Sequence, residues 1–243
     1  MPRVIVAAAG AQAKWDGYLG MRSHFVPVRS VLDRDEPLVP LLARTLDQLT
    51  VYTRDVWLTV PHDDPGPYED LAKRFDVRTH RAAPGCRNEF ESSRPVWTDQ
   101  AVNVLLLGDV WYTEEALDTI LVEAVVTGAA EDGFKFFGRE KLSRFTGSPW
   151  GEIFANSWRG DGTARMSELT DAVRREQDAG RADPTKHGWT VLRMLQGTPL
   201  RQHEVLPPWW VEVDDATDDI DFPADYRLHP ATRGLSKDGV LCV

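Results

Sequence analysis

The chain has 243 residues, of which 38 are acidic and 28 basic, and its formal net charge is −10 at pH 7. This balance, without a tract rich in Lys or Arg, argues against extended nucleic-acid binding, because neutralising phosphates needs clustered cations. With 42% hydrophobic and 27% charged residues, the composition is that of an ordinary soluble globular protein. We expect one domain, with or without a small added lobe.

The cysteine count and the N-terminal region bear on location. Cys86 and Cys242 are too few for a disulfide framework and have no metal-ligand spacing. The apolar stretch at residues 4–9 is followed at once by Gln12 and Lys14, and no later run approaches ~18 apolar residues. These features predict free thiols, a cytoplasmic location and no membrane association.

Strand and helix patterns alternate in the first half. Short apolar runs predict strands at 4–9, 56–60 and 102–107, with a weaker strand at 76–80. Helical spacing of apolar residues predicts helices at 38–49 with Pro37 in the first turn, at 68–75, and at 114–126 with Thr113 as the cap. The polar segment 81–101 is predicted to be a surface loop. This order predicts a mostly parallel sheet with helices on both faces.

The second half is less regular. It contains predicted strands at 134–137 and 209–213, predicted helices at 166–179 and 189–195, and an acidic stretch at 214–225. In an open α/β sheet, ligands bind outside the carboxyl ends of the strands. The loops after Ala9 and Leu107 are therefore the first places to expect a site.

Small residues end the first strand, at Ala8, Ala9, Gly10 and Ala11, and Lys14 follows shortly after. Small side chains let backbone amides approach a phosphate or a base, and Lys14 adds positive charge. The segment has neither the P-loop nor the dinucleotide glycine spacing, so a plain turn is the alternative.

Carboxylates follow two of the predicted strands. Asp109 comes after the strand at 102–107, where it suits Mg²⁺, although an N-cap or turn role explains it equally well. Asp214 follows the strand at 209–213 and is a candidate second ligand of the same cation. Most of the other acidic residues up to Asp225 are expected at a solvated helix start.

Several cations are candidate phosphate ligands, although each alone is also explained as a surface charge: Arg22, His24, Arg29, Lys135, Arg139 and Arg144. His24 has a second explanation as a half-buried, hydrogen-bonded side chain. Glu152 is a candidate to bind sugar hydroxyls, with Trp150 stacking on the ring or, alternatively, lying in the core. No Ser/His/Asp or Cys/His nucleophile arrangement stands out.

Taken in order, these segments resemble the sugar-nucleotide pyrophosphorylases, the nucleotidyltransferase-like proteins of the GT-A fold. The resemblance runs from about Val4 to about Tyr226. The matching segments are 4–10, Trp15, 19–20, 24–28, 37–38, 43–46, 93–97, 106–113, 136–139, 150–155 and 210–215.

The resemblance implies a single three-layer, Rossmann-like α/β domain over residues 1–243 with a mostly parallel central sheet. The half at about 1–113 would bind the nucleotide, and the half at about 114–243 the sugar or other acceptor. The implied reaction is in-line attack by a sugar phosphate, or a similar phosphorylated small molecule, on the α-phosphorus of an NTP, with pyrophosphate leaving.

The resemblance also implies roles for individual residues. Asp109 and Asp214 would bind Mg²⁺ or Mn²⁺, and Lys14 and Arg22 would be the phosphate cations. The implied nucleotide-binding residues are Ala8, Ala9, Gly10, Ala11, Arg94 and Gly108, and the implied substrate-binding residues are Arg139, Trp150 and Glu152.

Two departures from the family pattern leave three functions open. The family typically has an arginine where this chain has Lys14, and a Pro-Lys pair where it has Arg22 and Ser23. Ser23 cannot supply the missing charge, but the Arg22 guanidinium can bind the same oxygens. The chain is therefore a nucleotidyltransferase with a relocated cation, a GT-A glycosyltransferase using a nucleotide-sugar with His229 as an extra metal ligand, or a nucleotide-binding protein without catalysis.

Overall fold

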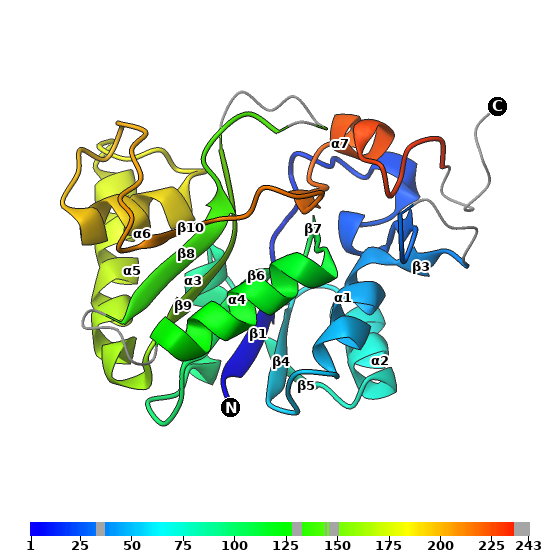
Figure 1. Cartoon of the computed structure of the whole chain (residues 1–243), viewed down its shortest axis with the longest axis horizontal. Helices are drawn as coiled ribbons and strands as arrows, with labels where there is room; N and C mark the ends of the chain where they lie inside the picture. The colour runs from blue at the N-terminus through cyan, green and yellow to red at the C-terminus, as the bar shows by residue number, and fades with distance from the viewer. Residues whose placement is uncertain (33–36, 128–132, 144, 146–150, 236–243) are drawn as a thin grey trace.

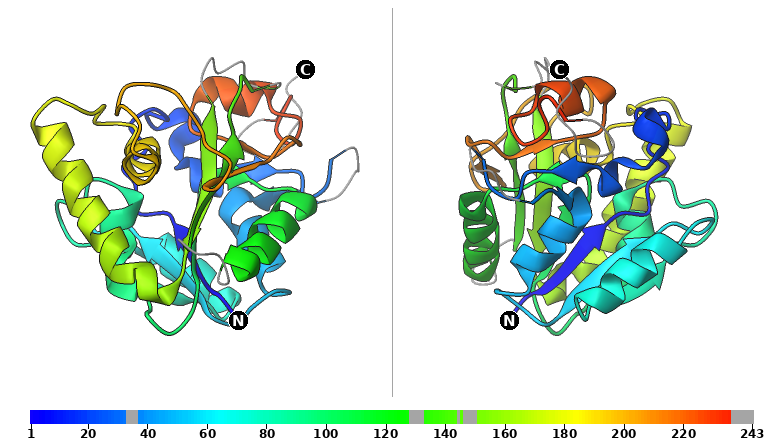
Figure 2. Two further views of the ribbon diagram at one scale, coloured as in Figure 1. Left: turned by 60° about the vertical axis from the view of Figure 1, so that its left-hand side comes forward. Right: turned by 90° about the vertical axis from the view of Figure 1, so that its right-hand side faces the viewer.

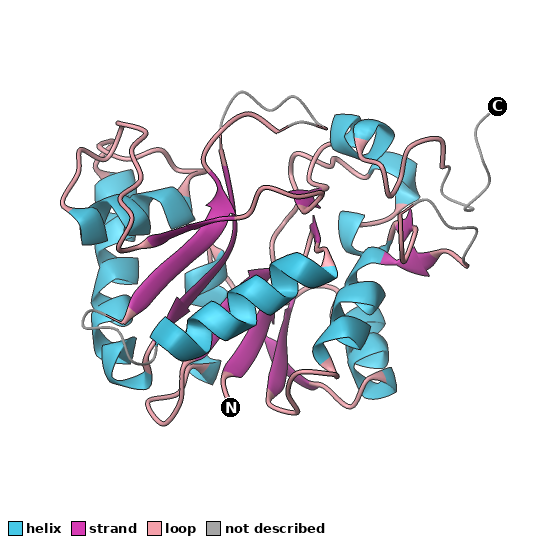
Figure 3. Cartoon of the chain, viewed as in Figure 1, coloured by secondary structure: helices cyan, strands magenta, loops and turns pink. Residues whose placement is uncertain are grey.

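A seven-stranded sheet forms the centre of the computed structural model, which describes residues 1–32, 37–127, 133–143, 145 and 151–235 (Figures 1 and 3). In spatial order the strands are β10 (Trp210–Glu212), β8 (Phe134–Arg139), β9 (Glu152–Trp158), β6 (Asn103–Leu107), β1 (Arg3–Ala7), β4 (Val56–Val60) and β5 (Arg78–Arg81). Neighbouring strands are parallel, except that β9 is antiparallel to both β6 and β8. The predicted mostly parallel α/β sheet is confirmed.

Helices cover both faces of the sheet and make three layers (Figure 2). One face carries α1 (Leu41–Leu49), α2 (Gly66–Arg74) and α4 (Glu114–Thr127), and the other carries α3 (Glu89–Ser93), α5 (Thr163–Asp178) and α6 (His187–Gln196). Alternation along β1 explains the two cores, because Val4 and Val6 face the first set of helices and Ile5 faces the second. No helix in the described part of the chain is long and apolar enough to cross a membrane.

Smaller elements cover the carboxyl edge of the sheet. They are β2 (Pro27–Val28) paired with β3 (Val39–Pro40), β7 (Val110–Trp111) paired with β11 (Asp218–Asp219), α7 (Pro223–Leu228), and the 3-10 helices Tyr18–Gly20 and Ser23–Phe25. A third core cluster, which includes Trp15, Trp111, Ile220 and Tyr226, joins them. This cluster holds the C-terminal segment against the edge where β1 and β6 end. Two other 3-10 helices, Arg94–Val96 and Gly160–Gly162, lie near the opposite edge, where β1 and β6 begin.

The structure differs from the predicted elements at three places. Helix α1 begins at Leu41, because residues 39–40 pair with β2 instead of continuing the helix. Residues 89–93 of the predicted loop form α3, whose first turn is capped by the Asn88 side chain accepting from the Glu91 N–H at 2.8 Å. Strand β9 was not predicted, since Asn156 and Ser157 interrupt its apolar pattern although both are buried.

Candidate functional site

A cavity of about 750 Å³, called the main cavity here, opens at the carboxyl ends of β1 and β6. Its walls come from the loop after β1, the loop after β5, the starts of α3 and α6, and the segment that follows β11. Its volume lies in the range typical of small-molecule sites. The main cavity lies where the open α/β topology predicts a ligand.

The loop after β1 supplies one wall of the main cavity. Ala9, Gly10 and Ala11 line it, whereas Ala8 is buried behind them and its N–H donates to the Thr59 side chain at 3.3 Å. Gly108 is also behind the wall, because a Cβ there would lie 2.8 Å from the Ala7 carbonyl oxygen. The small residues therefore serve both close packing and an open backbone surface.

Ser23, which stands where the family lysine is expected, stabilises this loop. Its N–H donates to the Gln12 Oε1 at 3.0 Å, and the Gln12 amide donates back to the Ser23 hydroxyl. Ser23 is fully buried, and Gln12 has a positive φ of 51°. The serine thus holds a strained turn in place and contributes no charge to the main cavity.

Two cations line the main cavity from this segment. Lys14 forms an ion pair with Asp221. Burial acts to lower the Lys14 pKa, but the charge and hydrogen bond of Asp221 together with the charges of Asp219 and Glu152 outweigh it, and the pKa is raised. Arg22 donates from Nη1 to the Gly10 carbonyl at 3.2 Å, and its Nη2 lies 3.6 Å from the exposed Asp63 carboxylate. Both predicted phosphate cations therefore face one cavity.

Asp109 lines the main cavity at the end of β6 and is half-buried. Burial, together with the charge of Asp221, raises the pKa of Asp109 to about 6. The Asp109 carbonyl accepts from the Ile220 N–H at 2.8 Å, next to the β7–β11 pairing. An N-cap role does not apply, since Thr113 caps α4 by accepting from the Ala116 N–H at 2.9 Å.

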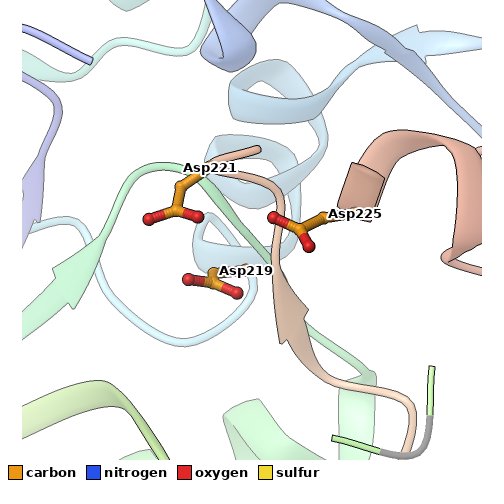
Figure 4. A group of neighbouring side chains, drawn as sticks. All are labelled: Asp219, Asp221 and Asp225. Atoms are coloured by element: carbon orange, nitrogen blue, oxygen red, sulfur yellow. The ribbon is translucent and has the colours of Figure 1, made fainter. Parts of the chain in front are cut away.

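The β7–β11 pairing brings a group of carboxylates close to Asp109. The side chains of Asp219, Asp221 and Asp225 have oxygens within 4.8 Å of one another (Figure 4). Asp225 accepts from the Phe222 N–H at 2.7 Å and so caps α7. Burial and the neighbouring carboxylates Glu152 and Asp221 raise the pKa of Asp219 well above its ordinary value. Carboxylates this close repel one another, which favours the binding of a cation beside them.

The predicted solvated helix start is wrong for the inner members of this acidic run. Asp218 is fully buried and Asp225 is 6% exposed. They are buried because β11 pairs with β7, and because Tyr226 of α7 packs into the third core cluster. Alternation was the available signal, since the fully buried Ile220 stands between Asp219 and Asp221 as in a half-buried strand.

Asp214 and Arg139 lie away from the main cavity. Asp214 is exposed after β10 and does not line the cavity, so it is not brought beside Asp109 as the sequence suggested. Arg139 is 2% exposed, lies 3.4 Å from the Asp218 carboxylate, and donates to the carbonyls of Asp215 and Thr217. Arg139 therefore holds the turn that leads to β11, and its burial leaves it no access to a substrate.

The other predicted site residues have mixed placements. Arg94 donates to the Asp171 carboxylate at 2.6 Å and does not line the main cavity. Glu152 begins β9 and is half-buried, close enough for its charge to act on Lys14 and Asp219. Trp150 lies outside the described residues.

Sequence reasoning did not single out several residues of the cavity wall, among them Glu89 of α3 and His187 of α6. Burial raises the pKa of Glu89, and the charge of His187 acts in the opposite direction. No sequence pattern marks either residue. For Glu89, the segment that forms α3 was itself predicted to be a loop.

The two candidate histidines have internal roles. His24 lines the main cavity but is buried, its Nδ1 is 2.8 Å from the Tyr68 hydroxyl, and burial and Arg22 lower its pKa to about 3. His229 uses both ring nitrogens, with Nε2 2.9 Å from the Ala216 carbonyl and Nδ1 accepting from the Ala231 N–H at 3.1 Å. The His229 ring therefore has no nitrogen left over for a metal.

Comparison with known proteins places the chain by its fold. No family model and no curated protein matches the sequence. Among solved structures it is similar to a phosphocholine cytidylyltransferase from Streptococcus pneumoniae, with 12% identity, 93% and 96% of the two chains covered and a TM-score of 0.55.

Two further structures are similar to the same extent. A 4-diphosphocytidyl-2C-methyl-D-erythritol synthase from Anaerococcus prevotii has 13% identity, covers 93% and 92% of the two chains and gives a TM-score of 0.54. For a cytidylyltransferase from Leptospira borgpetersenii the identity is 13%, the match covers 93% of this chain and 83% of the other, and the TM-score is 0.53. The fold is that of nucleotidyltransferases, and the predicted resemblance is confirmed at this level.

Proposed function

We propose that the chain is a Mg²⁺-dependent nucleotidyltransferase that joins an NTP to a sugar phosphate, or to a similar phosphorylated small molecule, and releases pyrophosphate. The observation that carries this proposal is the main cavity, where the carboxylates Asp109 and Asp221 face the cations Lys14 and Arg22. The likeness in fold to nucleotidyltransferases supports it.

Asp109 and Asp221 are the pair that we propose as metal ligands, with Asp221 taking the place that the sequence suggested for Asp214. Both line the main cavity, and the charge of one raises the pKa of the other. Carboxylate oxygens that repel one another are suitable donors for Mg²⁺, which takes one or two carboxylates and completes its shell with water and phosphates. Bound there, Mg²⁺ or Mn²⁺ would neutralise charge on the phosphates.

The nucleotide's phosphates fit against the loop after β1. Ala9, Gly10 and Ala11 leave its backbone accessible to them. The hydrogen bond from Arg22 to the Gly10 carbonyl places the guanidinium beside this loop, and we infer that Arg22 replaces the family lysine absent at Ser23. Lys14 reaches the same cavity and would neutralise the departing pyrophosphate.

In the proposed reaction an acceptor phosphate oxygen forms a bond to the α-phosphorus, and the bond from that phosphorus to the bridging oxygen of pyrophosphate breaks. No protein group has to form a covalent bond. The chain's task is to orient the two substrates in line and to stabilise the charge that shifts to the leaving group. Glu152, at the start of β9, is proposed to bind acceptor hydroxyls.

Glycosyl transfer is the alternative on this fold, and the geometry favours it less. That function was predicted with His229 as an extra metal ligand, but both ring nitrogens of His229 are used in hydrogen bonds within the protein. A nucleotide-binding protein without turnover is the third possibility, because a fold alone does not fix a reaction.

The experiment that tests the proposal is incubation of the purified protein with panels of NTPs, sugar phosphates and nucleotide-sugars, with Mg²⁺ or Mn²⁺ and pyrophosphate, followed by mass spectrometry. We expect a nucleotide-sugar and pyrophosphate in the forward direction, and an NTP and a sugar 1-phosphate in reverse. An NDP with free sugar would establish glycosyl transfer instead. Nucleotide binding without any product across the panel would favour loss of catalysis.

A further inference from the structure

A second cavity, of about 760 Å³, meets the main cavity at Pro184, which lines both. We call it the basic cavity, because three cationic side chains line it: Lys186, Arg193 and Arg201. Among the described residues of its lining, Asp183 is the one carboxylate. In a chain with a net charge of −10, this local excess of positive charge marks a distinct environment.

Asp183 is already engaged and does not neutralise these cations by direct contact. Its Oδ1 accepts two hydrogen bonds from Thr185, one from the backbone N–H and one from the hydroxyl, each 2.8 Å long. Those bonds lower the pKa of Asp183. Within the part of the chain that the structure describes, no ion pair joins it to a cation of the basic cavity.

Arg193 carries the most informative contact. It is only 8% exposed, and its Nη1 donates to the Leu200 carbonyl at 2.7 Å. Its Nε is buried and has no hydrogen-bond partner among the described residues. A buried donor without an acceptor is destabilising, and an anion bound beside the guanidinium would offset that cost. Burial lowers the Arg193 pKa, and the charge of Asp183 acts in the opposite direction.

An aromatic surface stands beside these donors. The Trp189 ring, which is 6% exposed, lines the basic cavity and stacks on Trp210 with ring centres 5.3 Å apart. Its centre is 4.7 Å from that of the His203 ring, in an edge-to-face arrangement. The Arg193 Cζ is 5.8 Å from the centre of the Trp189 ring. Packed aromatic rings of this kind suit the flat or apolar part of a ligand whose charged end meets the guanidinium groups.

From this arrangement we propose that the basic cavity is a second ligand site, which binds a small organic anion through Arg193, Arg201 and Lys186. Its ligand carries a phosphate or carboxylate group together with a ring or apolar part that packs on Trp189. The site does not depend on the proposed reaction. Its ligand has two possible sources, because the shared edge at Pro184 allows either the distal acidic group of an acceptor or a separate small molecule.

The test is a titration of the whole chain with inorganic phosphate, followed by calorimetry and by tryptophan fluorescence. We expect two phosphate sites, one in each cavity. The double substitution Lys186→Gln with Arg201→Gln changes the less buried cations and avoids the risk to folding that replacing Arg193 carries. It should weaken one site at least tenfold, and Trp189→Phe should remove the fluorescence change of that site.

Two control variants locate the effect. Lys14→Gln should weaken phosphate binding in the main cavity and leave the other site unchanged, and Arg165→Gln, on the exposed surface of α5, should change neither. Phosphate binding that is unchanged in the Lys186/Arg201 double variant, or a second site that disappears with Lys14→Gln, would overturn the proposal. Because these readouts need no turnover, they remain decisive even where the proposed reaction fails.

Turnover assays then distinguish the two sources of the anion. If the double variant raises the acceptor KM and leaves kcat unchanged, the basic cavity holds the acceptor's distal group. If it leaves the acceptor KM unchanged while phosphate binding there is lost, the ligand is a separate molecule. Both results support a ligand site in the basic cavity.

Discussion

The two cavities carry opposite charge although they meet at one residue, Pro184. In the main cavity Asp109 and Asp221 face each other, and Lys14 pairs with one of them. In the basic cavity three cations face one carboxylate that is engaged elsewhere. The main cavity is therefore suited to a divalent cation with phosphates, and the basic cavity to an anion.

Charges that hold the fold together are arranged differently from those of the cavities. Arg139 and Asp218 are 2% and 0% exposed, lie within 3.4 Å of each other, and are further tied by hydrogen bonds to backbone carbonyls and the Ser143 hydroxyl. An Nε without a hydrogen-bond partner among the described residues is common to Arg139 and Arg193. Arg193 differs in that, within the described part of the chain, it pairs with no carboxylate and donates to the Leu200 carbonyl alone. Neither burial nor an unpaired Nε alone therefore marks a functional charge here. A buried cation beside a cavity that pairs with no carboxylate among the described residues does.

The largest expected effect tests the cation site of the main cavity. Asp109→Asn should lower kcat at least about 10³-fold, because one of the two proposed metal ligands is lost. The same change should not lower the melting temperature, since it removes a charge whose pKa is raised by burial and by Asp221. Turnover and thermal unfolding measure the two effects. Activity within a factor of two of the parent chain would remove Asp109 from the site.

The next effect concerns the paired charges of the fold. Arg139→Gln should lower the free energy of unfolding by about 3 kcal/mol, because it leaves the buried Asp218 carboxylate without its cation. Arg165→Gln, which breaks an exposed pair with Glu168, should change it by less than about 0.5 kcal/mol. Chemical denaturation of both variants measures the difference. A stable Arg139→Gln chain that loses only substrate affinity would return Arg139 to the substrate-binding role predicted from sequence.

A smaller effect tests the cation that we infer to replace the family lysine. Arg22→Gln should lower kcat/KM about 10²-fold, comparable to the loss of one transition-state donor. Ser23→Ala should cost less activity and more stability, because Ser23 holds the Gln12 turn and adds no charge. Steady-state kinetics and thermal unfolding of the two variants separate these roles. Equal losses of kcat/KM in both would show that loop geometry, and not the guanidinium, is what matters.

The smallest expected effect is the pH dependence that His24, at the wall of the main cavity, gives to the free energy of unfolding. The His24 pKa is about 3 in the folded chain against 6.5 for an ordinary histidine, so the unfolded chain binds an extra proton between these values. The contribution of His24 to stability is therefore lost as the pH falls below 6.5, by about 1 kcal/mol at pH 5.5.

Comparison with His24→Gln isolates this contribution, because the opposing effects of carboxylates with raised pKa values, such as Asp109, are common to both chains. The free energy of unfolding should fall less between pH 7 and pH 5.5 in the variant than in the parent chain. Equal pH dependence in the two chains would mean that His24 is protonated within the fold.

The parts of this molecule that could be predicted from sequence are those fixed by local pattern. The apolar runs of β1 and β6 and the helical spacing of α1 and α4 defined the sheet, its helices and the edge where Asp109 emerges. The second carboxylate could not be assigned in the same way, because Asp214 and Asp221 both follow the one strand predicted there, at 209–213. A long-range pairing, β7 with β11, selects Asp221 for the main cavity.

Two other features, the burial of Arg139 and the basic cavity, could not be predicted because they also depend on long-range contacts. Arg139 has the charge and the sequence position expected of a substrate ligand, and only the fold shows that it is buried against Asp218. The basic cavity joins residues of α5, α6 and the loop at 199–203, which share no motif and come together only by packing. Charge in such a site is visible in the sequence, but its pairing is not.

A Mn²⁺ titration, followed by electron paramagnetic resonance, of the parent chain and of the variants Asp221→Asn and Asp214→Asn tests which carboxylate joins Asp109 in the proposed metal site. Mn²⁺ accepts the same oxygen ligands as Mg²⁺ and reports binding without turnover. We expect at least tenfold weaker Mn²⁺ binding for Asp221→Asn and binding within twofold of the parent chain for Asp214→Asn. Weakened binding in Asp214→Asn, with Asp221→Asn unchanged, would contradict the assignment of Asp221.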